Sequence, residues 1–519
     1  MKVGRSDFRI AIACGFLSSI ASAGCLAQPG TAKVGTFEGQ TDVGAVSPPG
    51  DAGYNATKDV YTVRAAGANM WSTTDAFHFA WKKMSGDVAI AANISFVGKV
   101  GTSDPHRKAA LIFRQTLEAD GTYVDAAQHG SGMTALQYRH EPGATTQDIE
   151  LNIESPQRLR LEKRGDTFTM FVSNHGEPLH QVGASTKLHL TEPFYVGIGV
   201  CSHNPAREET AMFWNFKIDE VQPETNAKTA VYSTLQTIGT EDNFRRAMVV
   251  ATEPGRMEAP NWSRDGKTLI FVKDGKIWTV PAEGGTASVL NTGTATRCTG
   301  SHGLSPDGKL LAISCSMPDK PETRVYLVPS SGGEPRLLTE NPWSYFHSWS
   351  PDGKTIAFTR PDHKGGGNIF AIPMEGGTEK ALTMGSGISD DPDYSADGQW
   401  IYFNSDRGST MQIWRMRADG SGAEQVTHDE FNSWTPHPSP DGKSILILSY
   451  DKGVTGHPTD TDVALRILNV SDGKIRVLVN VVGGAGSDNV PNWAPDGKHF
   501  AFVSFQKLPT DLDGGEAAH

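Results

Sequence analysis

The chain has 519 residues and a net charge of −12 at pH 7, and apolar residues make up 38% of it and charged residues 20%. This length exceeds what one small hydrophobic core needs and indicates two or three domains. The acidic balance argues against nucleic acid as a partner, because such binding rests on a basic face. The 56 glycines and 30 prolines favour many tight turns over long helices.

The first segment has the pattern of a signal peptide over residues 1–23, followed by a linker over residues 24–34. A basic start leads into an apolar run over residues 10–20, and small residues then offer a cleavage site. A lipid anchor on Cys25 is the alternative outcome of processing. Because no other apolar run is long enough to cross a bilayer, the sequence predicts a periplasmic or secreted protein that is not integral to a membrane.

Short β-type runs separated by turn residues fill residues 35–222. Examples are residues 87–92, 110–114, 168–172 and 194–200, in which β-branched, aromatic and other apolar side chains recur. Turn residues separate the runs at intervals typical of two packed sheets. The sequence therefore predicts a β-sandwich domain, jelly-roll-like in outline.

A turn that ends in Asp-Gly recurs six times in the C-terminal half. Its aspartates are spaced 42, 45, 45, 44 and 55 residues apart. A period in the forties with four strands per unit is typical of propeller blades. In each unit the Asp caps the turn and the Gly adopts a positive φ. The six turn aspartates are Asp265, Asp307, Asp352, Asp397, Asp441 and Asp496.

The fold class predicted is therefore all-β, with the β-sandwich followed by a six-bladed β-propeller over residues 223–506 and a disordered tail over residues 507–519. After the last Asp-Gly turn one more strand follows, at residues 499–505. Two further strand-like segments, residues 231–235 and 246–250, precede the first full repeat. We expect these two segments to become the outer strands of the last blade and to close the ring, which removes its open edges.

The cysteine content allows one disulfide but does not decide whether it forms. Cys298 and Cys315 are the pair that could form a bridge, and an oxidising compartment would permit it. Buried free thiols are an equally good interpretation of the same two residues.

Histidines and acids gather just before the repeated turns. Proline is usual five residues before each turn aspartate, but His302 and His347 stand there in the second and third blades. His437 of the fifth blade stands one residue later, four residues before its turn aspartate. The residues at these positions begin the innermost strands, on the face opposite the Asp-Gly turns. We therefore expect their side chains to surround the mouth of the central channel. The candidate catalytic and metal-binding residues are His302, His347 and His437, and the candidate ligand-binding residues are Tyr345, Asp390, Asp391, Asp393, Arg407, Trp434, His457, Arg466 and Asn489.

Such a ring of side chains is suited to several kinds of chemistry. Three histidines with several carboxylates could bind a divalent metal or supply a general base. Arginines could bind an acidic sugar, and Trp434 or Tyr345 could stack on a sugar face. The structural alternative is that each histidine only hydrogen-bonds a neighbouring blade, and side chains pointing into separate blade interfaces would contradict a shared site.

Three families resemble parts of this chain. The repeats over roughly residues 230–506 resemble those of the TolB family of periplasmic propellers, and more distantly those of oligogalacturonate lyases, in which histidines hold a metal. Trp71, residues 75–79, residues 86–88 and the run at 194–197 resemble concanavalin-like β-sandwich domains, which often accompany carbohydrate-acting proteins. The TolB resemblance implies an envelope protein as partner, although TolB itself carries a mixed α/β domain before its propeller. The concanavalin resemblance implies a glycan.

Three functions follow. The first is an exported, carbohydrate-related protein that binds a glycan or small ligand at the channel mouth. The alternatives are a metal-assisted carbohydrate lyase or hydrolase that uses the three histidines, and a TolB-like envelope scaffold that binds proteins. A divalent metal is the cofactor that these residue types would suit, and the sequence does not choose among the three functions or fix the oligomeric state.

Overall fold

The computed structural model describes residues 33–98, 103–151, 153–173, 179–221, 229–240, 246–362, 365–385 and 387–509. Every regular element within these ranges is a β-strand, as the predicted fold class requires, and no helix there could span a membrane. The predicted signal peptide, Cys25, most of the predicted linker, and the predicted tail from residue 510 lie outside the described residues.

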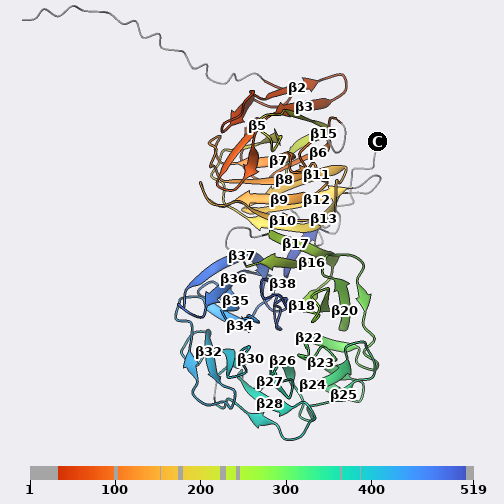
Figure 1. Ribbon diagram of the computed structural model, residues 1–519, viewed down its shortest axis with the longest axis vertical. Coiled ribbons are helices and arrows are strands. Elements are labelled where there is room, and N and C mark those ends of the chain that lie inside the picture. Colours follow the sequence, from red (N-terminus) through yellow and green to blue (C-terminus); the bar gives the residue numbers. More distant parts are fainter. Residues whose placement is uncertain are drawn as a thin grey trace, which may run out of the picture.

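The N-terminal domain consists of two facing β-sheets with an apolar core between them (Figure 1). Inward residues alternate with outward ones, so Ala109, Leu111 and Phe113 of β7 (Lys108–Arg114) join this core. In order, the first sheet contains β13 (His180–Lys187), β12 (Thr167–Ser173), β11 (Arg158–Arg164), β6 (Val88–Phe96), β15 (Glu209–Glu220), β3 (Val60–Ala65) and β2 (Asp51–Asn55). The second contains β1 (Gly39–Val43), β5 (Thr74–Met84), β14 (Phe194–Cys201), β7 (Lys108–Arg114), β8 (Tyr123–His129), β9 (Thr134–Arg139) and β10 (Gln147–Glu150), with β4 (Asn69–Trp71) paired to β5.

The C-terminal domain is a ring of six blades (Figure 1). Blade 1 contains β18 (Met257–Trp262), β19 (Thr268–Lys273), β20 (Lys276–Pro281) and β21 (Ser288–Val289), and blade 2 contains β22 (Arg297–Leu304), β23 (Leu310–Met317), β24 (Lys320–Pro329) and β25 (Arg336–Leu337). Blade 3 contains β26 (Tyr345–Trp349), β27 (Thr355–Pro361), β28 (Gly367–Pro373) and β29 (Lys380–Ala381), and blade 4 contains β30 (Ser389–Tyr394), β31 (Trp400–Ser405), β32 (Gln412–Arg417) and β33 (Glu424–Gln425). Blade 5 contains β34 (Asn432–Pro438), β35 (Ser444–Tyr450), β36 (Thr461–Asn469) and β37 (Ile475–Gly483).

The Asp-Gly turns join the first and second strands of each blade by a repeated set of hydrogen bonds. In blade 1, Ser263 Oγ donates to Asp265 Oδ1 at 2.7 Å and the Lys267 N–H donates to the same oxygen at 3.1 Å. Gly266 has a φ of 70°, and the glycine in each of the other five turns has a φ between 67° and 72°. The turn chemistry predicted from the sequence is confirmed, because this left-handed backbone is open to glycine at little cost.

The two ends of the propeller meet in blade 6. There β38 (His499–Pro509) pairs antiparallel with β16 (Thr229–Gly239), which pairs in turn with β17 (Arg246–Pro254). A bridge between Trp493 and Phe500 adds the innermost segment. The prediction that the segments before the first repeat close the ring is confirmed, and β38 continues past the predicted end of the propeller at residue 506.

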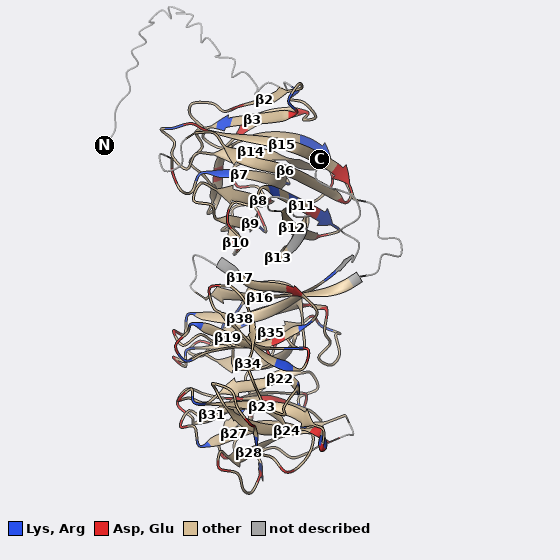
Figure 2. Cartoon of the chain, turned by 90° about the vertical axis from the view of Figure 1, so that its right-hand side faces the viewer, with Lys and Arg blue, Asp and Glu red and all other residues tan. Residues whose placement is uncertain are grey.

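The two domains share a continuous β-sheet. Residues 148–150 of β10 pair parallel with residues 246–248 of β17, so the second sheet of the N-terminal domain runs on into blade 6. β13 also packs against β16, β17 and β37, and β10, β13 and β17 lie together at the junction in both views (Figures 1 and 2). Gln506 donates from Nε2 to Thr169 Oγ1 at 2.8 Å across this junction. The N-terminal domain thus lies on the outer edge of blades 5 and 6.

One disulfide joins Cys298 of β22 to Cys315 of β23, which are direct partners in the strand register. The pairing that the sequence left open is therefore formed, and it ties the two inner strands of blade 2 together. Cys201 is a buried free thiol.

Removal of an apolar side chain from the closing strand should weaken the propeller. Leu235 of β16 is fully buried in a cluster with Val503 and Phe505 of β38. We expect Leu235→Ala to lower the free energy of unfolding by about 2 to 5 kcal/mol, because it removes transfer energy and leaves a cavity. The midpoint of urea unfolding measures this loss. Val289→Ala, at an exposed position of β21, should change the midpoint little, and equal effects of both variants would contradict the role of the closing strand.

Candidate functional site

The innermost strands are bulged where they enter one mouth of the channel. A bulge leaves residues unpaired and redirects their side chains. Asp391 has a φ of 50° and Thr435 a φ of 49°, a backbone conformation that residues other than glycine adopt mainly at constrained or functional positions. The register shifts fall between Glu258 and Asn261, Cys298 and His302, Phe346 and Ser348, Asp390 and Asp393, and Trp434 and His437.

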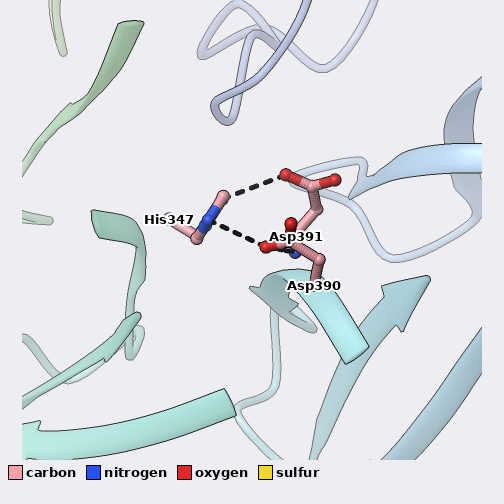
Figure 3. Close-up of side chains that lie close together, drawn as sticks. All are labelled: His347, Asp390 and Asp391. Carbon is pink, nitrogen blue, oxygen red and sulfur yellow. Dashed lines mark hydrogen bonds and ion pairs between the residues drawn. The ribbon is translucent and has the colours of Figure 1, made fainter. Parts of the chain in front are cut away.

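His347, in the bulge of blade 3, faces two carboxylates of blade 4 (Figure 3). Its Nε2 is 3.4 Å from Asp390 Oδ1 and its Nδ1 is 3.3 Å from Asp391 Oδ1. Each of these three residues offers a ligand atom within 4.8 Å of the others, and no other group in the described part of the chain meets this condition for a metal ion. Imidazole and carboxylate ligands suit Mn²⁺ and Zn²⁺.

The two carboxylates differ in their protonation. Burial opposes ionisation of Asp390, but the hydrogen bond and charge of His347 outweigh it and hold the pKa of Asp390 at about 2. Burial, followed by the negative charges of Asp390 and Asp488, raises the pKa of Asp391 well above its ordinary value. Asp391 Oδ2 is buried without a hydrogen-bond partner. The pair therefore has one stable negative charge and one carboxyl that would gain from a partner.

A second histidine reaches the same place from the long loop of blade 5. The His457 ring stacks on Trp434, with 4.6 Å between ring centroids and 15° between planes. Burial lowers the pKa of His457 to about 4, against the influence of Asp390, and its Nε2 has no hydrogen-bond partner. Tyr450 donates from its hydroxyl to Pro458 O at 2.7 Å, which fixes the loop beside His457. Since His457 covers Trp434, which is 4% exposed, Trp434 does not present a free face for a sugar.

Deeper in the channel, Asp488 and Thr435 complete the polar lining. Thr435 Oγ1 donates to Asp488 Oδ1 at 3.0 Å, and Asp488 Oδ2 is buried without a partner. Burial raises the pKa of Asp488 to about 7, although the charge of His437 opposes this. Sequence reasoning missed this residue. The signal available was the longest repeat spacing, because Asp488 ends the insertion before the last turn.

The three predicted histidines do not come together as one ligand set. His302 Nε2 lies 3.4 Å from Ile270 O of blade 1, and burial lowers its pKa to about 4. His437 Nδ1 lies 3.1 Å from Asp393 Oδ2 of blade 4, and its Nε2 donates to Asp488 O at 2.5 Å. These two histidines, with Asp393, link neighbouring blades. The metal group that the geometry supports is therefore His347 with Asp390 and Asp391, in place of the three histidines.

The predicted arginines are held inside their own blades. Arg466 donates to Ser449 Oγ at 2.7 Å and pairs with Asp429 at 2.7 Å. Arg407 donates to the hydroxyls of Ser389 and Ser405 at 2.8 and 3.1 Å. A carboxylate thus neutralises Arg466, whereas Arg407 has two hydroxyl partners and no carboxylate partner among the described residues, and binding of an acidic sugar by these arginines stays a prediction.

Tyr345 and Asn489 are the two remaining residues predicted at the channel mouth. Tyr345 is half-buried at the start of β26. Asn489 accepts a hydrogen bond from the Gly486 N–H at 2.6 Å, so it shapes the loop between blades 5 and 6. The structure thus brings together His347, Asp390, Asp391, Trp434 and His457, and the other predicted residues except Tyr345 make hydrogen bonds within the fold.

Comparisons with known proteins agree with this architecture. The profile of the TolB beta propeller domain matches residues 343–512. An uncharacterized protein of Agrobacterium fabrum, Atu1656, is 44% identical over 265 residues, which cover 50% of this chain and 89% of that protein. The chain belongs to the TolB-like β-propeller family. The solved structure of a putative TolB from Agrobacterium tumefaciens covers 54% of this chain and 100% of its own, with a TM-score of 0.51 and 40% identity.

Named TolB proteins are more distant members of this TolB-like family. The Tol-Pal system protein TolB of Francisella tularensis is 25% identical over 222 residues, which cover 40% of this chain and 49% of that protein. The chain thus spans about half the length of this curated relative. Oligogalacturonate lyase in complex with manganese is also among the matching structures, with a TM-score of 0.31 and 14% identity over 49% of this chain and 74% of its own. The concanavalin resemblance of residues 35–222 stays a prediction.

Asp488 makes the stability of this TolB-like propeller depend on pH. Its pKa is about 7 in the folded chain against an ordinary value of 3.8, so the folded state holds the proton more tightly. Stability is therefore lost as the pH rises from about 4 to about 7. We expect Asp488→Asn, which keeps the acceptor for Thr435, to raise the free energy of unfolding at pH 8 by roughly 1 to 4 kcal/mol and to match the parent near pH 4.

Urea unfolding at a series of pH values measures this difference. Asp441→Asn is the matched control of opposite sign, because a hydrogen bond from Ser439 lowers the pKa of Asp441 in its turn. Asp441→Asn should have a lower free energy of unfolding than the parent at pH values above the ordinary pKa of an aspartate. A loss of stability at pH 8 in Asp488→Asn as well would contradict a buried, protonated Asp488.

Proposed function

We propose that this protein is an exported, TolB-like envelope protein that binds a segment of a protein partner at the channel mouth, through a positively charged group on that segment. The observation that carries the proposal is the set of buried acceptors at the mouth. Asp391 Oδ2 and Asp488 Oδ2 have no hydrogen-bond partner, and Asp390 is a third exposed beside them. A buried acceptor gains free energy when a donor reaches it.

The charge of the site favours a cationic ligand over an acidic one. Asp390 is ionised over the whole physiological range, whereas burial raises the pKa of Glu258 on the opposite side, so the fixed negative charge comes from Asp390. The arginines that could have neutralised this face are paired elsewhere: Arg360 with Glu379 at 2.9 Å and Arg466 with Asp429 at 2.7 Å. A lysine, an arginine or an amino terminus therefore fits the mouth better than a uronate.

The family supports a protein partner. The curated relative from Francisella is a Tol-Pal system protein, and the propeller is the part that this chain shares with the family. Export follows from the predicted signal peptide. Glycan binding has less support, because His457 covers Trp434, the ring that was expected to stack on a sugar.

Site-specific photocrosslinking in the envelope of the producing cell tests the proposal. We expect p-benzoylphenylalanine in place of Tyr345, at the mouth, to give a discrete protein adduct. The same probe in place of Val289, which is exposed on the outer strand of blade 1, should not give it. Added Asp390→Asn and Asp391→Asn substitutions should reduce the adduct at least about tenfold, since each charge-assisted contact is worth about 1.5 to 3 kcal/mol.

The identity of the adduct decides the outcome. Mass spectrometry should find lysine, arginine or an amino terminus next to the crosslinked position of the partner. An adduct that survives the loss of both carboxylates, or that forms equally from Val289, would overturn the proposed recognition. A glycan adduct from the mouth would return the site to carbohydrate binding.

A second candidate function is a metal-assisted carbohydrate lyase or hydrolase, and the group of His347, Asp390 and Asp391 is the observation that favours it. In such an enzyme the metal would neutralise a substrate carboxylate, and His457, whose Nε2 has no partner, would be the candidate base. These residues fit a divalent ion in ligand type and spacing.

Metal binding and turnover separate the two functions. For the second candidate we expect Mn²⁺ to bind with a stoichiometry of about one, and His347→Ala to weaken it by about tenfold or more. An unsaturated uronate product should appear from oligogalacturonate, as followed by ultraviolet absorbance. His499→Ala, at an exposed histidine paired with Asp496, is the control. Metal binding without turnover of oligogalacturonate would remove the lyase and leave the binding function.

A further inference from the structure

Three histidines lie at one end of the second sheet of the N-terminal domain. β14, β7 and β8 are neighbours in that sheet, and the end of β14, the start of β7 and the end of β8 coincide there. His203 follows β14, His106 precedes β7, and His129 is the last residue of β8. Three separate segments of the chain therefore bring an imidazole to the same edge, far in sequence from the propeller site.

The His106 and His203 rings are spaced nearly as two histidines on one ion would be, whereas the His106 and His129 rings lie farther apart, and the ligand atoms of the three do not all lie within 4.8 Å of one another. The centroid of His106 lies 5.3 Å from that of His203 and 6.2 Å from that of His129. At a Zn–N distance of about 2.0 to 2.1 Å, a ring centroid lies about 3 Å from the ion, so two rings at a tetrahedral angle are about 5 Å apart. His106 is exposed, so its ring can turn to direct a nitrogen toward the point between the other two.

A carboxylate sets the tautomer of one ring. Asp104 Oδ1 lies 3.2 Å from His203 Nδ1, and the same oxygen accepts a hydrogen bond from the backbone N–H of His106 at 2.8 Å. A carboxylate on one imidazole nitrogen leaves the other as a lone-pair donor, which is the usual outer contact of histidines that bind metals. His203 has a φ of 59°, and its N–H donates to Gly67 O at 3.2 Å. A constrained backbone therefore holds the ring in place.

We propose that His106, His129 and His203 form a site for a transition-metal ion of the Zn²⁺ class, with Asp104 as a positioning residue. Three imidazoles are the ligands that Zn²⁺ and its neighbours favour, and they leave one coordination position for water or another ligand. This site is separate from the one at the channel mouth and does not depend on the function proposed for it.

Zn²⁺ titration of the full chain tests the site, in a His347→Ala background that removes the propeller group from the measurement. We expect one equivalent of Zn²⁺ to bind by isothermal titration calorimetry. His106→Ala and His203→Ala should each weaken binding at least about tenfold, and Asp104→Asn by about 10- to 100-fold. The matched control is His189→Ala, an exposed histidine of the same domain that pairs with Asp166 alone.

A spectroscopic measurement keeps the test independent of stability. Cu²⁺ bound to the same background should show three nitrogen couplings by electron paramagnetic resonance, and two after His106→Ala. His106 is exposed, so that variant should fold normally. The site would be overturned if His106→Ala and His203→Ala bound Zn²⁺ as tightly as His189→Ala does, or if the copper of the background protein showed fewer than three nitrogen couplings.

Discussion

The antiparallel pairing of β16 with β38 is the constraint on which the rest of the structure depends. It joins residues 229–239 to residues 499–509, so that a segment preceding all the repeats becomes the third strand of the last blade. Because β17 pairs with β16 on one side and with β10 on the other, the same closure attaches the N-terminal domain. The spacing of the blades around the channel, and hence the meeting of blade 3 with blade 4 at His347, requires that ring to be closed.

The N-terminal domain also covers the strand edges that would otherwise be exposed. In blades 1 to 4 the outermost strands β21, β25, β29 and β33 have two residues each, and edges this short offer little to another chain. In blades 5 and 6 the outermost strands β37 and β17 have nine residues each. These two long edges are the ones that β13 and β10 contact. The N-terminal domain therefore covers the strand edges of blades 5 and 6, whereas in blades 1 to 4 the outermost strands are too short to pair readily with another chain.

The sequence was sufficient for the blades because each turn is local. Ser, Asp and Gly within a few residues of one another satisfy the hydrogen bonds of the turn, so the repeat is visible without knowledge of the fold. The candidate site was only partly predictable, because it depends on what the next blade supplies. His302 and His347 occupy the same position of the repeat, but the neighbour of His302 is a main-chain carbonyl and the neighbours of His347 are two carboxylates. The bulges that direct these residues into the channel also produce no periodic pattern in the sequence, so they could not be predicted from it.

The cost of the site indicates that it is functional. Buried acceptors without partners destabilise a fold, and the propeller architecture does not demand them. At the position of Asp391 the other blades carry Ala259, Ser301, Phe346, Thr435 and Val490, so five of the six blades form the same mouth without an acid. In the described part of the propeller, Asp391 Oδ2, Asp488 Oδ2 and Glu379 Oε1 are buried carboxylate oxygens without a hydrogen bond, and the first two lie where blade 4 faces the loop before the last turn. Two such oxygens that face each other across one part of the channel mouth are the pattern expected when a ligand supplies the missing donors, since proteins tend to keep local strain and unsatisfied groups where function requires them.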